Sequence, residues 1–184
     1  GVSVKPILLI SGRSPFCETF FDDVKVPKEN LMGEQDKGWT IAKYLLTHER
    51  EMISGIGGRA RKKFCETAVD SIGLENGRLA DPVLRTEIAK FELNVLAFAK
   101  TMERVTDETK SGKGLGPASS IFKYYGTELN KTRCELMINV QGEKAMGWEG
   151  EDYHGGLVPR TWLRSKGNSI EGGTSEVQLN IIAK

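Results

Sequence analysis

The spacing of apolar residues divides the chain into a short extended start and a long helical remainder. Residues 2–10 and 20–27 alternate apolar and polar positions, the second stretch with an interruption at two aspartates, so we predict a strand in each. From Lys37 onwards apolar residues recur every three to four positions, which predicts helices. Two strands alone are marginal in water, so we interpret residues 1–28 as the tail of a β domain that begins upstream.

The first helical stretch starts at Lys37, and its apolar stripe runs from Trp39 through Leu45 to Ala68. This pattern predicts one helix of about 33 residues. Asp81 and Pro82 are a typical N-cap and first-turn pair, which predicts the start of a second helix. That helix is expected to end in the glycine-rich stretch of residues 111–116.

A third helix is predicted to open at Pro117, and residues 159–167 form a shorter helical stretch before a last helix. Three long helices and one shorter helix with short connections predict an all-α fold. We expect an up-down-up-down four-helix bundle over residues 29–184, preceded by the short β remnant.

Composition narrows the classes of function. The 184 residues carry a net charge of +1, and the basic residues form no block that would favour nucleic acid. No apolar run reaches the roughly 20 residues of a membrane span. Three widely spaced cysteines indicate reduced thiols in an intracellular protein, and with only two histidines we expect no metal site. Because the chain starts at Gly1 inside a predicted strand, we expect a piece of a longer protein.

Glu49 is the most informative single residue, because the helical spacing places its carboxylate on the apolar stripe of the first helix. Burial raises the pKa of a glutamate towards the range that suits a general base. A buried ion pair would explain the same position, and both interpretations stay open. Arg50 follows about 100° round the helix and suits a ligand carboxylate or a solvated surface.

The stretch NSIEGGTSEVQLNIIAK predicts a loop that turns abruptly into the last helix. Gly172 and Gly173 allow positive φ and close approach of a ligand, and Thr174 suits an N-cap. The open N–H groups of such a helix start favour an anionic oxygen, although a plain capped turn would give the same sequence. Gln141 and Gly142 are typical of a helix end and its C-cap, where ligand contact is the alternative.

Two long motifs resemble the acyl-CoA dehydrogenase family. They are FFDDVKVPKENLMGEQDKGW before the first long helix and IEGGTSEVQLNIIAK at the end. The resemblance covers the chain from the last strands of the family's middle β domain to the last helix of its C-terminal helical domain. It implies an FAD enzyme of fatty acid metabolism and β-oxidation that desaturates acyl-CoA thioesters between the α and β carbons.

The resemblance also implies roles for particular residues and partners. A carboxylate removes the α proton, and the backbone N–H of Gly172 donates to the thioester carbonyl oxygen, with Arg50 and Gly173 near the substrate. Contacts to FAD are implied at four positions: Gln141, Gly142, Thr174 and Glu176. Electrons pass to an electron-transferring flavoprotein, and members form homo-oligomers, dimers or tetramers. The EGGTSEVQ form of the last motif resembles bacterial members, so we expect a bacterial, cytoplasmic protein.

The position of the base departs from the family's commonest pattern. Many members carry a glutamate where this chain has Gly172, and Glu171 precedes it here. A second group, similar to isovaleryl-CoA and long-chain enzymes, carries the base on the first long helix just before an arginine. Glu49 and Arg50 match that arrangement. We therefore assign the base to Glu49, with Glu171 as the alternative and a chain without a base as the third interpretation.

Two further departures concern the cofactor. The RxxFG motif, through which a neighbouring subunit helps to bind FAD, is absent from SIGLENGRLADPVLR. The QxxGGxG motif is reduced to QGEKAMG, with Lys144 and Ala145 in place of the paired glycines. The alternative function is therefore a non-catalytic partner subunit of a heteromeric dehydrogenase, in which the bundle serves as an oligomerisation module.

Overall fold

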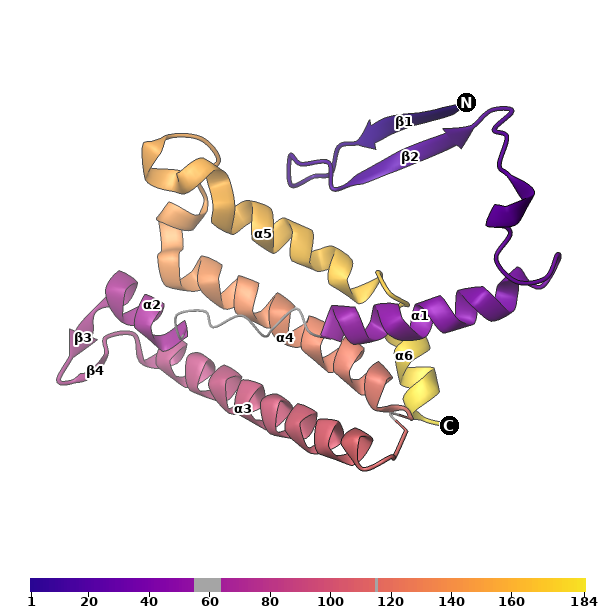
Figure 1. The fold of residues 1–184 in the computed structure, drawn as a ribbon. Helices are drawn as coiled ribbons and strands as arrows, with labels where there is room; N and C mark the ends of the chain where they lie inside the picture. Colours follow the sequence, from indigo (N-terminus) through magenta and orange to yellow (C-terminus); the bar gives the residue numbers. More distant parts are fainter. Residues whose placement is uncertain (55–63, 115) are drawn as a thin grey trace.

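The computed structural model describes residues 1–54, 64–114 and 116–184. Long helices run alternately in opposite directions around a central helix, α4 (Ala118–Gln141), as Figure 1 shows. Helices α1, α3, α5 and α6 all pack against α4. The predicted all-α bundle with a short β segment is confirmed.

A two-stranded antiparallel hairpin opens the chain. Strand β1 (Val2–Ile7) pairs with β2 (Phe16–Phe21), and Val2 lies opposite Phe21. The prediction of a second strand at residues 20–27 was therefore wrong. The chain already pairs from Phe16, and the strand ends at Phe21 because the backbone bends next to Asp23, whose φ is +46°.

The first long helical stretch contains α1 (Gly38–Ser54) and α2 (Phe64–Ile72). The prediction of one uninterrupted helix depends on residues 55–63, which lie outside the described residues. The predicted stripe of α1 is not fully buried, because Trp39 is 70% and Leu45 64% exposed. Helix α1 packs mainly on α4. Because the apolar stripe is wider than the surface that one neighbouring helix covers, part of the stripe stays exposed.

Helix α3 (Pro82–Lys110) begins and ends where the sequence predicted. The side chain of Asp81 accepts hydrogen bonds from the backbone N–H groups of Val83 and Leu84, each at 2.9 Å. Ser111 forms the C-cap. Helix α4 follows after a short connection, with Pro117 at its N-cap position. The sequence signals for the end of α3 and for the start of α4 are therefore both confirmed by the structure.

The hydrophobic core lies between α2, α3 and α4. Phe64 and Phe91 meet edge to face, with ring centroids 5.8 Å apart, and Leu136 and Val140 of α4 close the cluster. A small hairpin, β3 (Leu74–Glu75) and β4 (Arg78–Leu79), connects α2 to α3 and buries Leu79 against the same cluster. These residues form the continuous apolar contact that holds the three helices together.

After α4 the chain passes through two 3-10 turns, η3 (Gly142–Ala145) and η4 (Glu151–Gly156), into α5 (Leu157–Ser165). A third 3-10 turn, η5 (Lys166–Ser169), leads to the last helix, α6 (Ser175–Ile182). The predicted short helical stretch and last helix are both present. Helices α5 and α6 and turn η5 pack on α4, so one helix supports the whole C-terminal segment.

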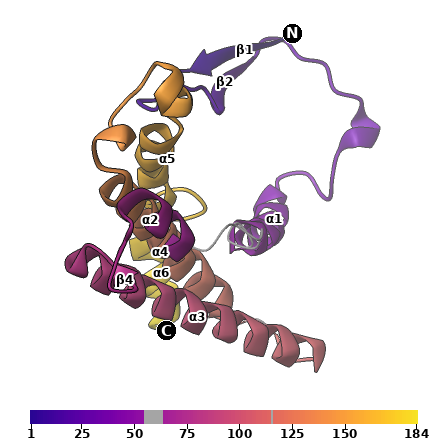
Figure 2. The ribbon, with the colours of Figure 1, turned by 90° about the vertical axis from the view of Figure 1, so that its left-hand side faces the viewer.

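The first hairpin lies beside α5, and Figure 2 shows it on the opposite side of the molecule from α3. Arg160 Nη1 donates to the Ser11 carbonyl oxygen at 2.7 Å, and its guanidinium stacks 3.8 Å from the Trp148 ring centroid. Gly12 lies against the same guanidinium with a φ of +72°, so a larger residue there would collide with Arg160. Arg160 therefore joins parts of the chain that are 149 residues apart.

Replacing Asp81 by alanine removes the acceptor for two N–H groups at the start of α3. We expect the free energy of unfolding to fall by about 0.5–2 kcal/mol, as measured by chemical denaturation. Asp107→Ala is the matched control, because Asp107 lies in the same helix and makes only an exposed ion pair with Lys110 at 3.7 Å. That variant is expected to change stability by less than about 0.5 kcal/mol. Equal losses in the two variants would contradict the capping role.

Candidate functional site

The loop between η5 and α6 contains Glu171, Gly172, Gly173 and Thr174, and we call it the two-glycine loop. Gly172 and Gly173 have φ values of +65° and +94°. A Cβ atom on Gly173 would lie 2.5 Å from Nε2 of Gln178. The backbone conformation therefore favours glycine at position 173, and any side chain there would have to displace the Gln178 amide.

Thr174 caps α6, as predicted. Its hydroxyl oxygen accepts a hydrogen bond from the Val177 N–H at 3.3 Å. The carboxylate of Glu176 accepts from its own backbone N–H and from the Thr174 hydroxyl, and these bonds lower the pKa of Glu176. Thr174 and Glu176 thus satisfy polar groups in the first turn, while contact between either residue and a cofactor stays a prediction.

Glu171 is tied to the segment that precedes it. Its Oε2 accepts from Arg164 Nη2 at 2.6 Å, and its Oε1 accepts a short hydrogen bond from Asn168 Nδ2. The Arg164 and Glu171 side chains are 33% and 28% exposed, so water screens the pair only in part. Both carboxylate oxygens of Glu171 have partners, which commits this carboxylate to holding the loop.

Asn168 connects Glu171 to α4. Its backbone oxygen accepts from Lys123 Nζ at 3.0 Å, and its Oδ1 accepts from Asn130 Nδ2 at 2.8 Å. Its Nδ2 donates to the Glu171 carboxylate, so both polar groups of the Asn168 side chain are hydrogen-bonded. The loop is therefore connected through Asn168 to the central helix.

Lys123 of α4 was not among the residues that the sequence analysis singled out. The residue is 0% exposed, and burial lowers the pKa of its ammonium group, while the charges of Glu171 and Glu128 oppose that shift. Ser120 and Thr127, one turn before and after, are also buried. Ser120, Lys123 and Thr127 recur at helical spacing on the side of α4 that lies opposite its apolar stripe. This spacing indicates that α4 is buried on two faces.

Gln178 of α6 is the second buried polar residue that the sequence reasoning missed. It is fully buried, and its Nε2 donates to the Gly172 carbonyl oxygen at 3.0 Å. Its Oε1 has no hydrogen-bond partner, and the same is true of the Ser120 hydroxyl among the described side chains. The Gln178 amide is therefore held by the loop, because the Gly172 carbonyl oxygen is the acceptor for its Nε2 group.

Glu49, the predicted base, lies in α1 and is half-buried. Helix α1 packs against α4, as α6 does, so Glu49 and the two-glycine loop belong to elements supported by the same central helix. The side chain of Arg50 lies outside the described residues, although its backbone is part of α1. The nearby glycines at 55, 57 and 58 also lie outside the described residues.

The family described as "Acyl-CoA dehydrogenase, C-terminal domain" matches residues 36–184, most of the chain. The chain belongs to the acyl-CoA dehydrogenase family. It is 26% identical over its whole length to the acyl-CoA dehydrogenase IpdE1 of Mycolicibacterium smegmatis, of which it covers 45%. It is 35% identical to the acyl-CoA dehydrogenase FadE29 of Mycobacterium tuberculosis, covering 100% of this chain and 48% of that protein.

Solved structures of this family share the fold. The structure titled "Tcur3481-Tcur3483 steroid ACAD" superposes on 100% of this chain and 47% of its own chain, with a TM-score of 0.81 and 24% identity. The ChsE4-ChsE5 complex from Mycobacterium tuberculosis gives a TM-score of 0.75 at 22% identity, over 100% of this chain and 49% of that one. The chain thus spans about half the length of the relatives it matches.

The family depends on FAD, and the residues predicted to contact it can be examined for fit. Gln141 Nε2 donates to the Met137 sulfur at 3.7 Å, a weak bond that a ligand oxygen would replace favourably. Gly142 has a φ of +56°, with open space where a side chain would lie. Both residues therefore suit a ligand at the end of α4. Ala145, in place of a family glycine, is instead fully buried in η3.

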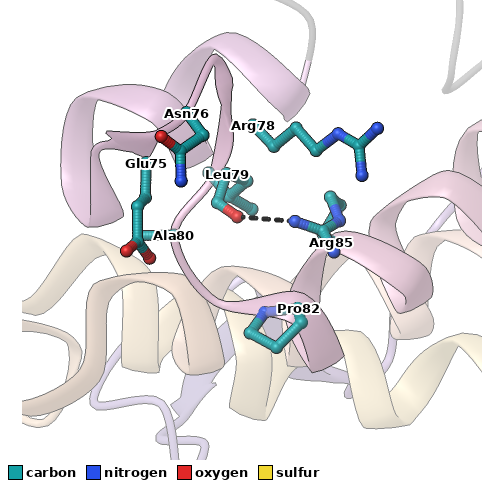
Figure 3. Close-up of a pocket in the computed structure, with 7 residues that line it drawn as sticks. All are labelled: Glu75, Asn76, Arg78, Leu79, Ala80, Pro82 and Arg85. Atoms are coloured by element: carbon teal, nitrogen blue, oxygen red, sulfur yellow. Dashed lines mark hydrogen bonds between the residues drawn. The ribbon is translucent and has the colours of Figure 1, made fainter.

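The connection that lacks the RxxFG motif forms a pocket of about 530 Å³ beside β3, β4 and the start of α3 (Figure 3). Arg85 Nη1 donates to the Leu79 carbonyl oxygen at 3.1 Å, the dashed contact in Figure 3. None of the predicted site residues lines this pocket, whose walls are Glu75, Asn76, Arg78, Leu79, Ala80, Pro82 and Arg85. The predicted site and the pocket are therefore separate parts of the molecule.

Metal and membrane features are absent from the part of the chain that the structure describes. No three histidine, cysteine or acidic side chains gather there in a way that would hold a metal ion. None of the described helices is long and apolar enough to cross a membrane.

Proposed function

We propose that the whole protein is an FAD-dependent acyl-CoA dehydrogenase that desaturates an acyl-CoA thioester between its α and β carbons. Family membership supports the class of reaction. The observation that carries the assignment of residues is the binding of both Glu171 oxygens by Arg164 and Asn168. A carboxylate held by two donors of its own chain serves to hold the loop, which favours Glu49 over Glu171 as the base.

In this proposal each residue has one role. Glu49 accepts the α proton of the substrate, and Arg50 and Gly173 shape the place where the acyl group lies. The N–H of Gly172 donates to the thioester carbonyl oxygen, where negative charge develops as the proton leaves. Gln141, Gly142, Thr174 and Glu176 would hold FAD in part, and the bound flavin would supply the acceptor for the β hydride.

Partners follow from the same proposal. Electrons leave through an electron-transferring flavoprotein, and the protein works in the bacterial cytoplasm in fatty acid β-oxidation. Helix α3 exposes Val83, Leu93 and Leu96, apolar side chains that suit a contact between subunits. We infer a homo-oligomer, a dimer or a tetramer, with the bundle at its interface.

The second candidate is a non-catalytic partner subunit of a heteromeric dehydrogenase. The missing RxxFG motif and the buried Ala145 favour it, because the resemblance to the family implies flavin contacts at both motifs. Solved relatives include the ChsE4-ChsE5 complex, so the fold occurs in an assembly of unlike chains.

Purification of the full-length protein separates the two candidates. The enzyme is expected to carry the visible absorbance of bound flavin and to reduce an artificial electron acceptor when acyl-CoA is added. A colourless protein that acquires activity only when mixed with a second, flavin-bearing chain would support the partner subunit and contradict the enzyme.

A further inference from the structure

Side chains from three elements fix the two-glycine loop on both sides of Gly172. On one side, Gln178 of α6 holds the Gly172 carbonyl oxygen at 3.0 Å. On the other side, Arg164 of α5 and Asn168 of η5 hold the Glu171 carboxylate. The peptide that carries the Gly172 N–H joins Glu171 to Gly172 and therefore lies between these anchors. Its orientation depends on both of them.

The Arg164–Glu171 pair is less exposed to water than the ion pairs that the structure describes on α3. Its two side chains are about one-third exposed, whereas Lys100 and Glu103 on α3 are 66% and 62% exposed. A charge-assisted bond of 2.6 Å in a partly buried place is stronger and more directional than a surface pair. The Arg164 guanidinium also lies 5.2 Å from the Phe16 ring centroid, which connects it to the first hairpin.

We propose that Arg164 and Glu171 are positioning residues that aim the Gly172 N–H at the thioester carbonyl oxygen. This inference rests on the proposed function, because the Gly172 N–H matters only if a thioester binds there. Arg164 acts through Glu171, and Glu171 acts through the peptide that follows it.

The physical reason is the freedom of two consecutive glycines. Gly172 and Gly173 have positive φ values, and glycine populates many other conformations at similar energy. Without an anchor the loop would spread over these conformations, and the N–H would lose its direction. A donor displaced by about 1 Å lowers the rate about 10²-fold, so a modest loosening of the loop is visible in kcat.

Lys166 offers a matched control two residues further along. Its ammonium group forms an ion pair with Glu135 of α4 and lies 4.7 Å from the Trp162 ring centroid. Like Arg164, it combines an ion pair with an aromatic contact, but its carboxylate partner is on α4 rather than in the two-glycine loop. Replacing Lys166 therefore removes a similar ion pair and aromatic contact while the Arg164–Glu171 pair stays in place.

The first experiment measures kcat and KM of the full-length enzyme. Arg164→Gln is expected to lower kcat by about 10-fold to 10²-fold, with a smaller change in KM. Arg164→Lys should recover part of the loss, and Lys166→Gln should stay within about twofold of the wild type. The double variant Arg164→Gln/Glu171→Gln should be no slower than the slower single variant, because both changes release the same anchor. Additive losses would overturn the inference.

The second experiment measures binding without turnover, on chemically reduced enzyme under anaerobic conditions. The probes are an acyl-CoA thioester and the matching thioether, in which a methylene replaces the carbonyl. The wild type and Lys166→Gln should prefer the thioester, and Arg164→Gln should lose most of that preference. Glu171→Gln removes the same ion pair with an almost isosteric side chain, so it replaces Arg164→Gln if that variant does not fold.

The outcomes separate the inference from the proposed function. A wild-type protein that binds neither CoA probe would overturn the proposed function and the inference with it. If the wild type prefers the thioester, and Arg164→Gln and Glu171→Gln prefer it equally, the inference is overturned while the proposed function stands.

Discussion

Replacing Glu49 by glutamine in the full-length enzyme is expected to lower kcat by about 10² to 10⁴-fold while acyl-CoA binding is largely kept. Glutamine preserves the shape and much of the polarity of the side chain but cannot accept the α proton. Glu49 is half-buried in α1, so the isosteric change should leave the packing on α4 intact. The measurement is steady-state turnover with an artificial electron acceptor, combined with thermal melting.

Glu171→Gln is the control for Glu49→Gln. Because Glu171 is held by Arg164 and Asn168, its replacement should loosen the loop and lower kcat by about 10-fold, less than the loss at Glu49. If Glu49→Gln turns over normally while Glu171→Gln is inactive, the base lies in the loop.

The same variant tests the ion-pair interpretation of Glu49. If Glu49 neutralises a buried cation, Glu49→Gln should reduce the free energy of unfolding by about 3–5 kcal/mol. A large fall in the melting temperature with a small fall in kcat would therefore support a structural role and contradict the catalytic one.

Phe91→Ala is expected to cause a large loss of stability. Phe91 is buried between α2 and α4 and meets Phe64 edge to face, so truncation leaves a cavity that the helices cannot fill. We expect a loss of about 3–5 kcal/mol, which corresponds to a melting temperature lower by about 6–20 °C for a domain of this size. Thermal unfolding followed by circular dichroism measures it.

Lys90→Ala, at the neighbouring exposed position of α3, is the control and should change stability by less than about 0.5 kcal/mol. If both variants melt at the same temperature, the helices are not held together by the cluster around Phe91.

The sequence predicted the helix ends well because those signals are local. Asp81 and Pro82 open α3, Ser111 ends it, and Thr174 caps α6. Each signal depends on hydrogen bonds or steric limits within one turn, so a neighbouring helix does not change it. The long motifs at the two ends of the chain also predicted the family, which the comparison confirms.

The errors lie where pairing or covering by another element decides the outcome. The second strand was placed at residues 20–27, whereas it pairs from Phe16. Alternation shows where a strand suits the sequence, but register is decided by the partner strand and the turn between them. Likewise the apolar stripe of α1 was predicted correctly as a pattern, although Trp39 and Leu45 are exposed because α4 covers only part of it.

The sequence by itself determined the helical class, the caps and the family, through apolar spacing and short motifs. Only the tertiary structure decided that Lys123 is buried on Asn168, 45 residues away, and that Arg164 and Glu171 meet. Lysine, arginine and glutamate are found at the surface unless they are paired, and a sequence does not show which pairs form. Packing of α5, η5 and α6 on the polar face of α4 creates those pairs, and with them the geometry of the two-glycine loop.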